Sequence, residues 1–178
     1  KALARFNGHA GIVTIYDSFR ENNTAYLVMQ YVEGMTLKQY LTQKGNKIPF
    51  EEALKIMMPV LDALREIHSA GMIHRDISPD NIYLSQQGHV KLLDFGAARY
   101  AVSEQSRSLS VVLKPGYAPE EQYRSKGNQG PWTDIYAAAA TMFRAVTGEP
   151  PIESLDRLAN DTLQLPSQKN ISIPPSME

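Results

Sequence analysis

Two short segments hold a concentrated set of carboxylate and amide side chains. The first is His74-Arg75-Asp76-Ile77-Ser78-Pro79-Asp80-Asn81, and the second is Asp94-Phe95-Gly96. Phosphoryl transfer needs a carboxylate that accepts a hydroxyl proton and oxygen ligands that hold magnesium. The two segments supply side chains of both kinds. A lone Asp-Phe-Gly is typical of a simple turn, so the indication comes from the pair.

In type, order and spacing, the pair resembles the catalytic loop and the metal-binding motif of protein kinases. Gly116-Tyr117-Ala118-Pro119-Glu120-Glu121 resembles the end of their activation segment, and Asp134 follows where the family has a buried aspartate. The resemblance runs from Lys1 to about Leu155. The chain is therefore identified as a member of the eukaryotic-like Ser/Thr protein kinases of bacterial type.

The resemblance implies roles in catalysis and nucleotide binding. Asp76 would be the base, and Asn81 and Asp94 would hold Mg²⁺, with Mn²⁺ as an alternative. Met29 would be the gatekeeper beside the hinge of Gln30, Tyr31 and Val32, and Tyr83 would form the floor under the adenine of ATP.

The resemblance also implies structural roles. His74 and Phe95 would stack with Leu3 and Ile15 as a hydrophobic spine anchored on Asp134. Glu121 would pair with an arginine beyond Glu178, so its carboxylate would lack that partner here. His9, His68 and His89 are expected at the surface or in turns.

Regulation is expected at the activation segment. Arg75 resembles the arginine that receives a phosphorylated segment, and phosphate is predicted on the serines that precede the Pro-Gly-Tyr stretch. These candidates are Ser106, Ser108 and Ser110.

Two positions depart from the family pattern. The usual lysine two residues after the catalytic aspartate is Ser78, and the usual threonine before Pro-Gly-Tyr is Lys114. One hypothesis is that the charge has moved between loops, with Lys114 supplying its ammonium to the phosphate or to Asp76. The alternative is that Lys114 is solvated and Ser78 is simply tolerated.

The apolar patterns predict the elements that must position these residues. Runs at 12–16 and 25–29, separated by Glu21-Asn22-Asn23, indicate a β-hairpin. Apolar residues at 3 and 4 spacing over 50–69 predict a long amphipathic helix closed by Gly71. A second, alanine-rich helix is expected to run to Val146, with Thr133 as its N-cap and Gly148 at its stop. Short strands are expected near 82–84 and 90–93.

Composition excludes several classes of function. The 178 residues have a net charge of -1 and no cysteine, which excludes disulfides and zinc-thiolate sites and fits a reducing, cytoplasmic compartment. Lysines and arginines are scattered, so nucleic acid is not an expected partner. No apolar stretch is long enough to span a bilayer, although a longer parent could carry an anchor. Oligomeric state cannot be predicted from the sequence.

The expected fold is α+β and protein-kinase-like, a mainly helical large lobe with residual small-lobe strands. Residues 1–32 would be the end of the small lobe with the hinge, and 33–178 the large lobe truncated near helix G. The glycine-rich loop and the ATP-binding lysine would precede Lys1, so the chain alone is expected to be inactive. The expected partners are ATP and a protein substrate. The alternatives are a pseudokinase or scaffold module and, less favoured, a small-molecule kinase of the aminoglycoside type, because such enzymes lack the Ala118-Pro119 ending.

Overall fold

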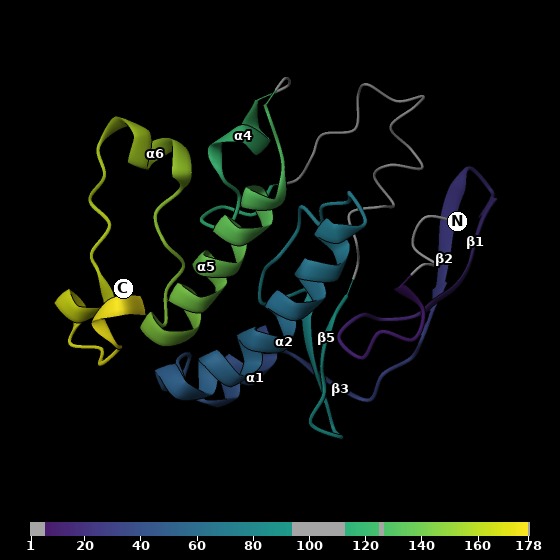
Figure 1. Ribbon diagram of the computed structural model, residues 1–178, viewed down its shortest axis with the longest axis horizontal. Helices are drawn as coiled ribbons and strands as arrows, with labels where there is room; N and C mark the ends of the chain where they lie inside the picture. Colours follow the sequence, from purple (N-terminus) through teal and green to yellow (C-terminus); the bar gives the residue numbers. More distant parts are fainter. Residues whose placement is uncertain (1–5, 94–112, 125–126, 178) are drawn as a thin grey trace.

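The computed structural model describes residues 6–93, 113–124 and 127–177. Its elements are β1 (Ile15–Glu21), β2 (Thr24–Met29), β3 (Gly34–Thr36), α1 (Leu37–Gln43), α2 (Phe50–Ser69), β4 (Ile82–Ser85), β5 (Val90–Leu92), α4 (Glu120–Tyr123), α5 (Pro131–Thr147) and α6 (Ser154–Ala159), followed by the 3-10 turns η2 (Pro166–Lys169) and η3 (Pro175–Met177). Figure 1 shows the helices gathered on one side and the β1–β2 hairpin on the other. This arrangement is α+β, as predicted.

The centre of the helical part is the packing of α2 against α5, which lie side by side in Figure 1. The buried residues of α2 recur at helical spacing, and they include Ala53, Val60, Leu64 and Ile67. The prediction of a helix over 50–69 is confirmed. The helix stops because Gly71 takes a left-handed backbone with φ 72°, which glycine adopts without steric cost.

Helix α5 begins earlier than predicted. Its N-cap is Gly130, and Pro131 occupies the first turn, where its fixed φ and missing N–H are tolerated. The prediction of Thr133 as N-cap is therefore wrong, because Thr133 lies inside the first turn and is buried. The predicted stop at Gly148 is confirmed by its φ of 91°.

The β1–β2 hairpin forms a sheet of its own. Its turn is Asn22-Asn23, with φ of 50° and 57°, a conformation that asparagine tolerates better than most residues. The hairpin is confirmed, but β1 begins at Ile15 rather than at residue 12. Ile12 instead makes a parallel bridge to Leu92 of β5, which ties the segment before the hairpin to the helical body.

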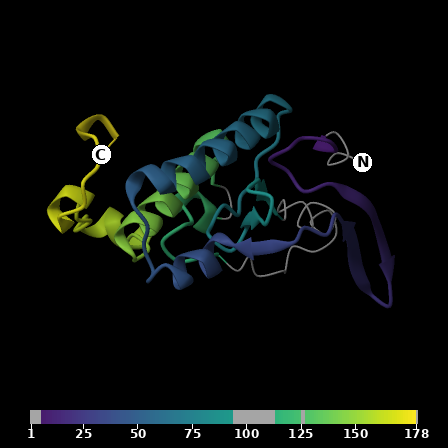
Figure 2. The same ribbon diagram turned by 90° about the horizontal axis from the view of Figure 1, so that it is seen from below.

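Strands β3, β4 and β5 form a small antiparallel sheet in that order. Strand β3 and the following helix α1 were not predicted, although Thr36 and Gln39 form a capping box at the start of α1. Figure 2, which turns the molecule by 90°, shows the hairpin extending away from the helices. Among the described helices, none combines the length and apolar character needed to cross a membrane.

Candidate active site

The loop between α2 and β4 is fixed by one buried carboxylate. Asp134 in the first turn of α5 is fully buried, and it accepts hydrogen bonds from the backbone N–H of His74 (2.8 Å) and of Arg75 (2.7 Å). A carboxylate removed from water is stable only when its oxygens are hydrogen-bonded. Asp134 thus holds the backbone at His74 and Arg75, whereas the expected spine anchored on it stays a prediction.

Arg75 adopts a left-handed backbone, with φ 70°. This conformation is unfavourable for a residue with a side chain and persists only where the surroundings hold it. Its N–H bonds Asp134, and the next residue, Asp76, donates its own N–H to His74 Nδ1 at 3.3 Å. The candidate base thus directly follows a residue whose backbone is held from outside the loop.

His74 is fully buried, and its Nε2 lies 3.1 Å from the carbonyl oxygen of Leu93. A buried ring in contact with backbone fits the structural role that the resemblance implies. Ile15 lies at the start of β1. The other two spine candidates, Leu3 and Phe95, lie outside the described residues.

Asn81 is oriented by its neighbours. Its side-chain Nδ2 donates to the carbonyl oxygen of Asp76 at 2.7 Å, which leaves the amide oxygen as the atom available to a cation. The backbone N–H of Leu93 donates to the Asn81 carbonyl at 2.8 Å, so the residue before Asp94 lies beside Asn81. Amide and carboxylate oxygens suit a hard divalent cation, and Asn81 fits such a site. Asp94 itself lies outside the described residues.

The two positions that depart from the family pattern are in contact. The Lys114 ammonium lies 2.8 Å from Ser78 Oγ and 3.1 Å from Asp76 Oδ1, although 36 residues separate Lys114 from Ser78. Ser78 is fully buried, and the Lys114 side chain is 30% exposed. Lys114 is therefore not a solvated surface lysine, and the structure brings it together with the candidate base.

Lys114 is held by a docked turn. Its carbonyl accepts the backbone N–H groups of Tyr117 and Ala118, both at 3.1 Å, and Ser154 Oγ donates to the Ala118 carbonyl at 2.9 Å. Burial raises the pKa of the Tyr117 hydroxyl, so this group stays protonated near neutral pH. A contact between this turn and Ser154, in the segment that follows α5, thus helps to position Lys114 beside the loop.

The candidate nucleotide-binding residues lie at the end of β2 and on β4. Met29 ends β2 and is 38% exposed, and the Gln30 N–H donates to the Thr14 carbonyl at 2.8 Å. Tyr31 and Val32 continue the chain from there towards β3. Tyr83 on β4 donates its hydroxyl to the carbonyl of Gly34 at 2.9 Å, which links the proposed floor to the segment after the hinge.

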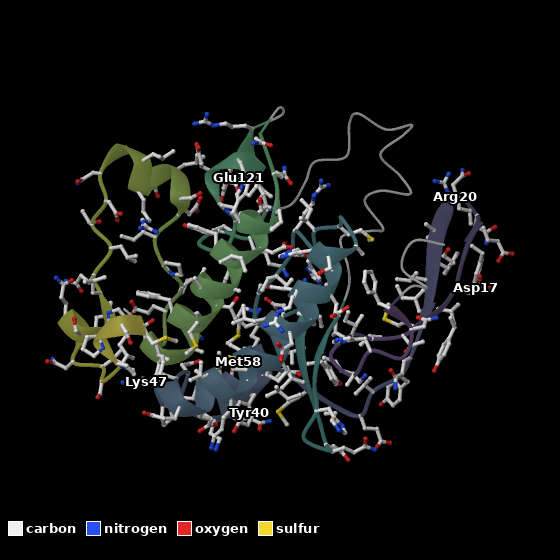
Figure 3. All side chains as sticks on the ribbon, in the orientation of Figure 1. Asp17, Arg20, Tyr40, Lys47, Met58 and Glu121 are labelled. Carbon is white, nitrogen blue, oxygen red and sulfur yellow. The ribbon has the colours of Figure 1, made fainter. Side chains whose placement is uncertain are left out.

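Glu121 has a partner within the chain. Thr133 Oγ1 donates to Glu121 Oε1 at 2.7 Å. The first turn of α5 thus supplies a hydroxyl to this carboxylate, and the pairing of Glu121 with an arginine stays a prediction. Figure 3 shows Glu121 on α4, at the end of the molecule where α5 begins.

The structure also places two side chains that sequence reasoning missed. His68 was expected at the surface, but its side chain is 15% exposed and its Nε2 lies 2.7 Å from Asp134 Oδ2. Its position four residues after Leu64, on the buried face of α2, was the available signal. Gln122, whose Nε2 donates to the Arg75 carbonyl at 2.8 Å, carried no such signal.

The remaining histidines lie as predicted, and the candidate phosphorylation sites cannot be placed. His9 accepts a turn hydrogen bond from the Gly11 N–H, and His89 is exposed, as expected. Ser106, Ser108 and Ser110 lie outside the described residues. Within 6–93, 113–124 and 127–177 there is no cluster of three or more His, Asp or Glu side chains that could hold a metal by itself.

Comparison with known proteins shows the family to which the chain belongs. The family model described as "Protein kinase domain" matches residues 1–177, so the chain belongs to the protein kinase domain family. It is similar to the serine/threonine-protein kinase PrkC of Bacillus subtilis (40% identity over 177 residues, 96% of this chain and 27% of that protein) and to PknL of Mycobacterium tuberculosis (36% over 152 residues, 85% and 37%).

A solved structure titled "PpkA-294 apo form" is also similar. It superposes with a TM-score of 0.81 at 37% identity, covering 99% of this chain and 62% of the solved chain. The chain thus spans less than two fifths of the length of these two curated relatives.

Proposed function

We propose that this chain is the catalytic-loop part of a bacterial-type protein Ser/Thr kinase that transfers the γ-phosphate of ATP to hydroxyl groups of proteins. The observation that carries the proposal is the Asp76 carboxylate held 3.1 Å from the Lys114 ammonium, in a loop fixed on Asp134. The similarity to named serine/threonine-protein kinases supports the same reaction.

In this proposal Asp76 orients the substrate hydroxyl and accepts its proton as phosphate is transferred. The Lys114 ammonium, beside Asp76, offsets negative charge on the transferred phosphate, which is the role of the loop lysine that Ser78 replaces. Ser78 Oγ accepts a hydrogen bond from Lys114 and keeps the ammonium at this position. Because the Lys114 ammonium contacts both Asp76 and Ser78, positioning and charge compensation would come from the same small cluster.

Asn81 with Asp94 would hold the divalent cation, Mg²⁺ or alternatively Mn²⁺, and when bound that cation neutralises phosphate charge. The orientation of the Asn81 amide, with Nδ2 on the Asp76 carbonyl, supports this assignment. The backbone of 29–32 would hydrogen-bond the adenine, and Tyr83 would close the nucleotide site from below, because its hydroxyl already bonds Gly34.

The division of the chain follows from these roles. Residues 1–32 would be the end of a small lobe with the hinge, and 33–178 a large lobe. The glycine-rich loop and the lysine that contact ATP would be supplied by a longer parent protein, and regulation would act through phosphate on Ser106, Ser108 or Ser110 and its contact with Arg75. A cytoplasmic site of action fits a cysteine-free chain that uses ATP.

The test uses the full-length parent protein with γ-labelled ATP, Mg²⁺ and a generic protein substrate such as myelin basic protein. We expect label on serine or threonine, and loss of at least about a hundredfold in rate for Asp76→Asn, which keeps the shape of the side chain but removes the base. Asp62→Asn, on the exposed face of α2, is the matched control. ATP binding without transfer in the parent would identify a pseudokinase and overturn the proposal.

A further inference from the structure

Gln122 connects the helix after the activation segment to the catalytic loop. It lies on α4, it is partly buried, and its Nε2 donates to the Arg75 carbonyl at 2.8 Å across 47 residues of sequence. Nothing in the family pattern of the sequence assigned it a role.

The contact falls on a residue whose backbone is already constrained. Arg75 has a left-handed backbone, and its N–H is held by Asp134 at 2.7 Å. Its carbonyl belongs to the peptide group that leads into Asp76, so Asp134 holds one side of the residue and Gln122 holds the other. With both backbone groups bonded, the peptide between Arg75 and Asp76 has one favoured orientation.

The surroundings make this orientation matter for the reacting groups. Gln122 lines a small cavity together with Arg75, Asp76, Lys114 and Tyr117, and the cavity holds about 10 Å³, room for about one water molecule. A rotation of the Arg75–Asp76 peptide would break the hydrogen bond from the Gln122 amide and would change the backbone angles that direct the Asp76 side chain.

We infer that Gln122 is a positioning residue, which fixes the peptide before the base and so couples the docking of α4 to the alignment of Asp76 with Lys114. The contact itself is observed in the structure, whereas its relevance to catalysis rests on the proposed function. It predicts that the loop loses its alignment when the amide donor is removed, even though the rest of the fold is retained.

The experiment compares Gln122→Met and Gln122→Glu in the full-length parent protein. Both keep the length of the side chain and remove the amide donor. Gln87→Met, in the exposed turn between β4 and β5, is the matched control. Rates are measured over a range of ATP concentrations, and hydrogen exchange is followed in peptides covering 74–81 and, separately, α5.

We expect kcat to fall by about tenfold in both Gln122 variants, with KM for ATP within about twofold of the parent value, because the contact orients the base rather than the nucleotide. Exchange in 74–81 should speed up by about tenfold while α5 is unchanged. If Gln122→Met destabilises the whole fold, Gln122→Glu is the second variant in which loss of the amide donor can be told apart from loss of global stability.

Unchanged kcat in a folded variant would overturn the inference. So would a loss of kcat with unchanged exchange in 74–81, or with exchange raised equally in α5, because either result would mean that Gln122 acts by another route. If the parent protein shows no kinase activity, the proposed function fails, while the exchange measurement still decides whether Gln122 holds the loop.

Discussion

The Lys114 ammonium lies 3.1 Å from a carboxylate oxygen of Asp76, and 2.8 Å from the hydroxyl of Ser78. A cation two residues after the base would be carried by the catalytic loop itself, whereas Lys114 reaches the base from a turn docked on the segment after α5. The charge near the base therefore depends on where the 113–118 segment sits. With Asp76 as the proposed base, this dependence would link the position of that segment to catalysis through the Lys114–Asp76 ion pair.

Lys114→Met should lower kcat by about tenfold or more in the full-length protein, because it removes the ammonium and retains the apolar stem. KM for ATP should change by less than about threefold, since the lysine is expected to act on the transferred phosphate. Steady-state kinetics with a peptide substrate measure both. Lys47→Met, on the exposed loop before α2, is the control. A variant with the parent rate would show that Lys114 has no catalytic role.

Returning both departing positions to the family pattern should restore the kinase activity that the loss of Lys114 removes. Ser78→Lys combined with Lys114→Thr returns the cation to the catalytic loop, and the buried position of Ser78 next to the space that Lys114 vacates gives the new side chain room. We expect the double variant to be at least about tenfold more active than Lys114→Thr alone, a coupling of about 1.4 kcal/mol. Strictly additive losses of activity in the double-mutant cycle would contradict the idea that a lysine at position 78 and a lysine at position 114 supply the same charge.

Asp134→Asn should destabilise the fold by about 1–3 kcal/mol, because an amide nitrogen would face backbone donors that now meet a carboxylate oxygen. His68 would lose its carboxylate partner at the same time. Urea unfolding followed by circular dichroism measures the change. Asp62→Asn, which breaks an exposed pair with Arg65, should cost less than about 1 kcal/mol. Equal effects of the two substitutions would mean that the buried aspartate does not anchor the loop.

Gly34→Ala should be more damaging than Gly88→Ala. Both glycines have positive φ, 154° and 82°, so both substitutions carry backbone strain. Only at Gly34 would the added Cβ collide with backbone, at the Leu84 carbonyl, whereas nothing lies near it at Gly88.

The collision should push β3 away from β4 and loosen the Tyr83 hydrogen bond to Gly34. We expect ATP affinity of the parent protein, measured by calorimetry, to fall by about tenfold for Gly34→Ala and by less than about threefold for Gly88→Ala. Similar affinities for the two variants would argue against Tyr83 as part of the nucleotide site.

Much of the fold could be predicted because its signals are local. The helix over 50–69 follows from apolar periodicity, and the hairpin from the turn at Asn22-Asn23. The start of α5 was misplaced because Thr133 is a good N-cap by type, while Pro131 fits the first turn better. Strand β3 is only three residues long, too short to leave a pattern.

In the candidate site, too, residues identified by local spacing could be proposed from the sequence, whereas contacts between distant residues could not. Asp76, Asn81 and Asp94 could be proposed from the sequence because the loop chemistry requires these residue types at a fixed spacing. The environment of His68 and the contacts of Gln122 could not, because each depends on a partner about fifty to seventy residues away. A side chain carries no mark of a partner that only chain folding brings near it.

The sequence by itself determined the class of chemistry, the main helices and the fact that the usual cation is missing from the loop at Ser78. Only the tertiary structure decided that Lys114 lies beside Asp76 and Ser78, that Asp134 holds the backbone before Asp76, and that Gln122 holds the same residue from the other side. The physical reason is that composition and spacing act over a few residues, whereas an ion pair or a buried hydrogen bond is set by the packing of segments that are distant in the chain.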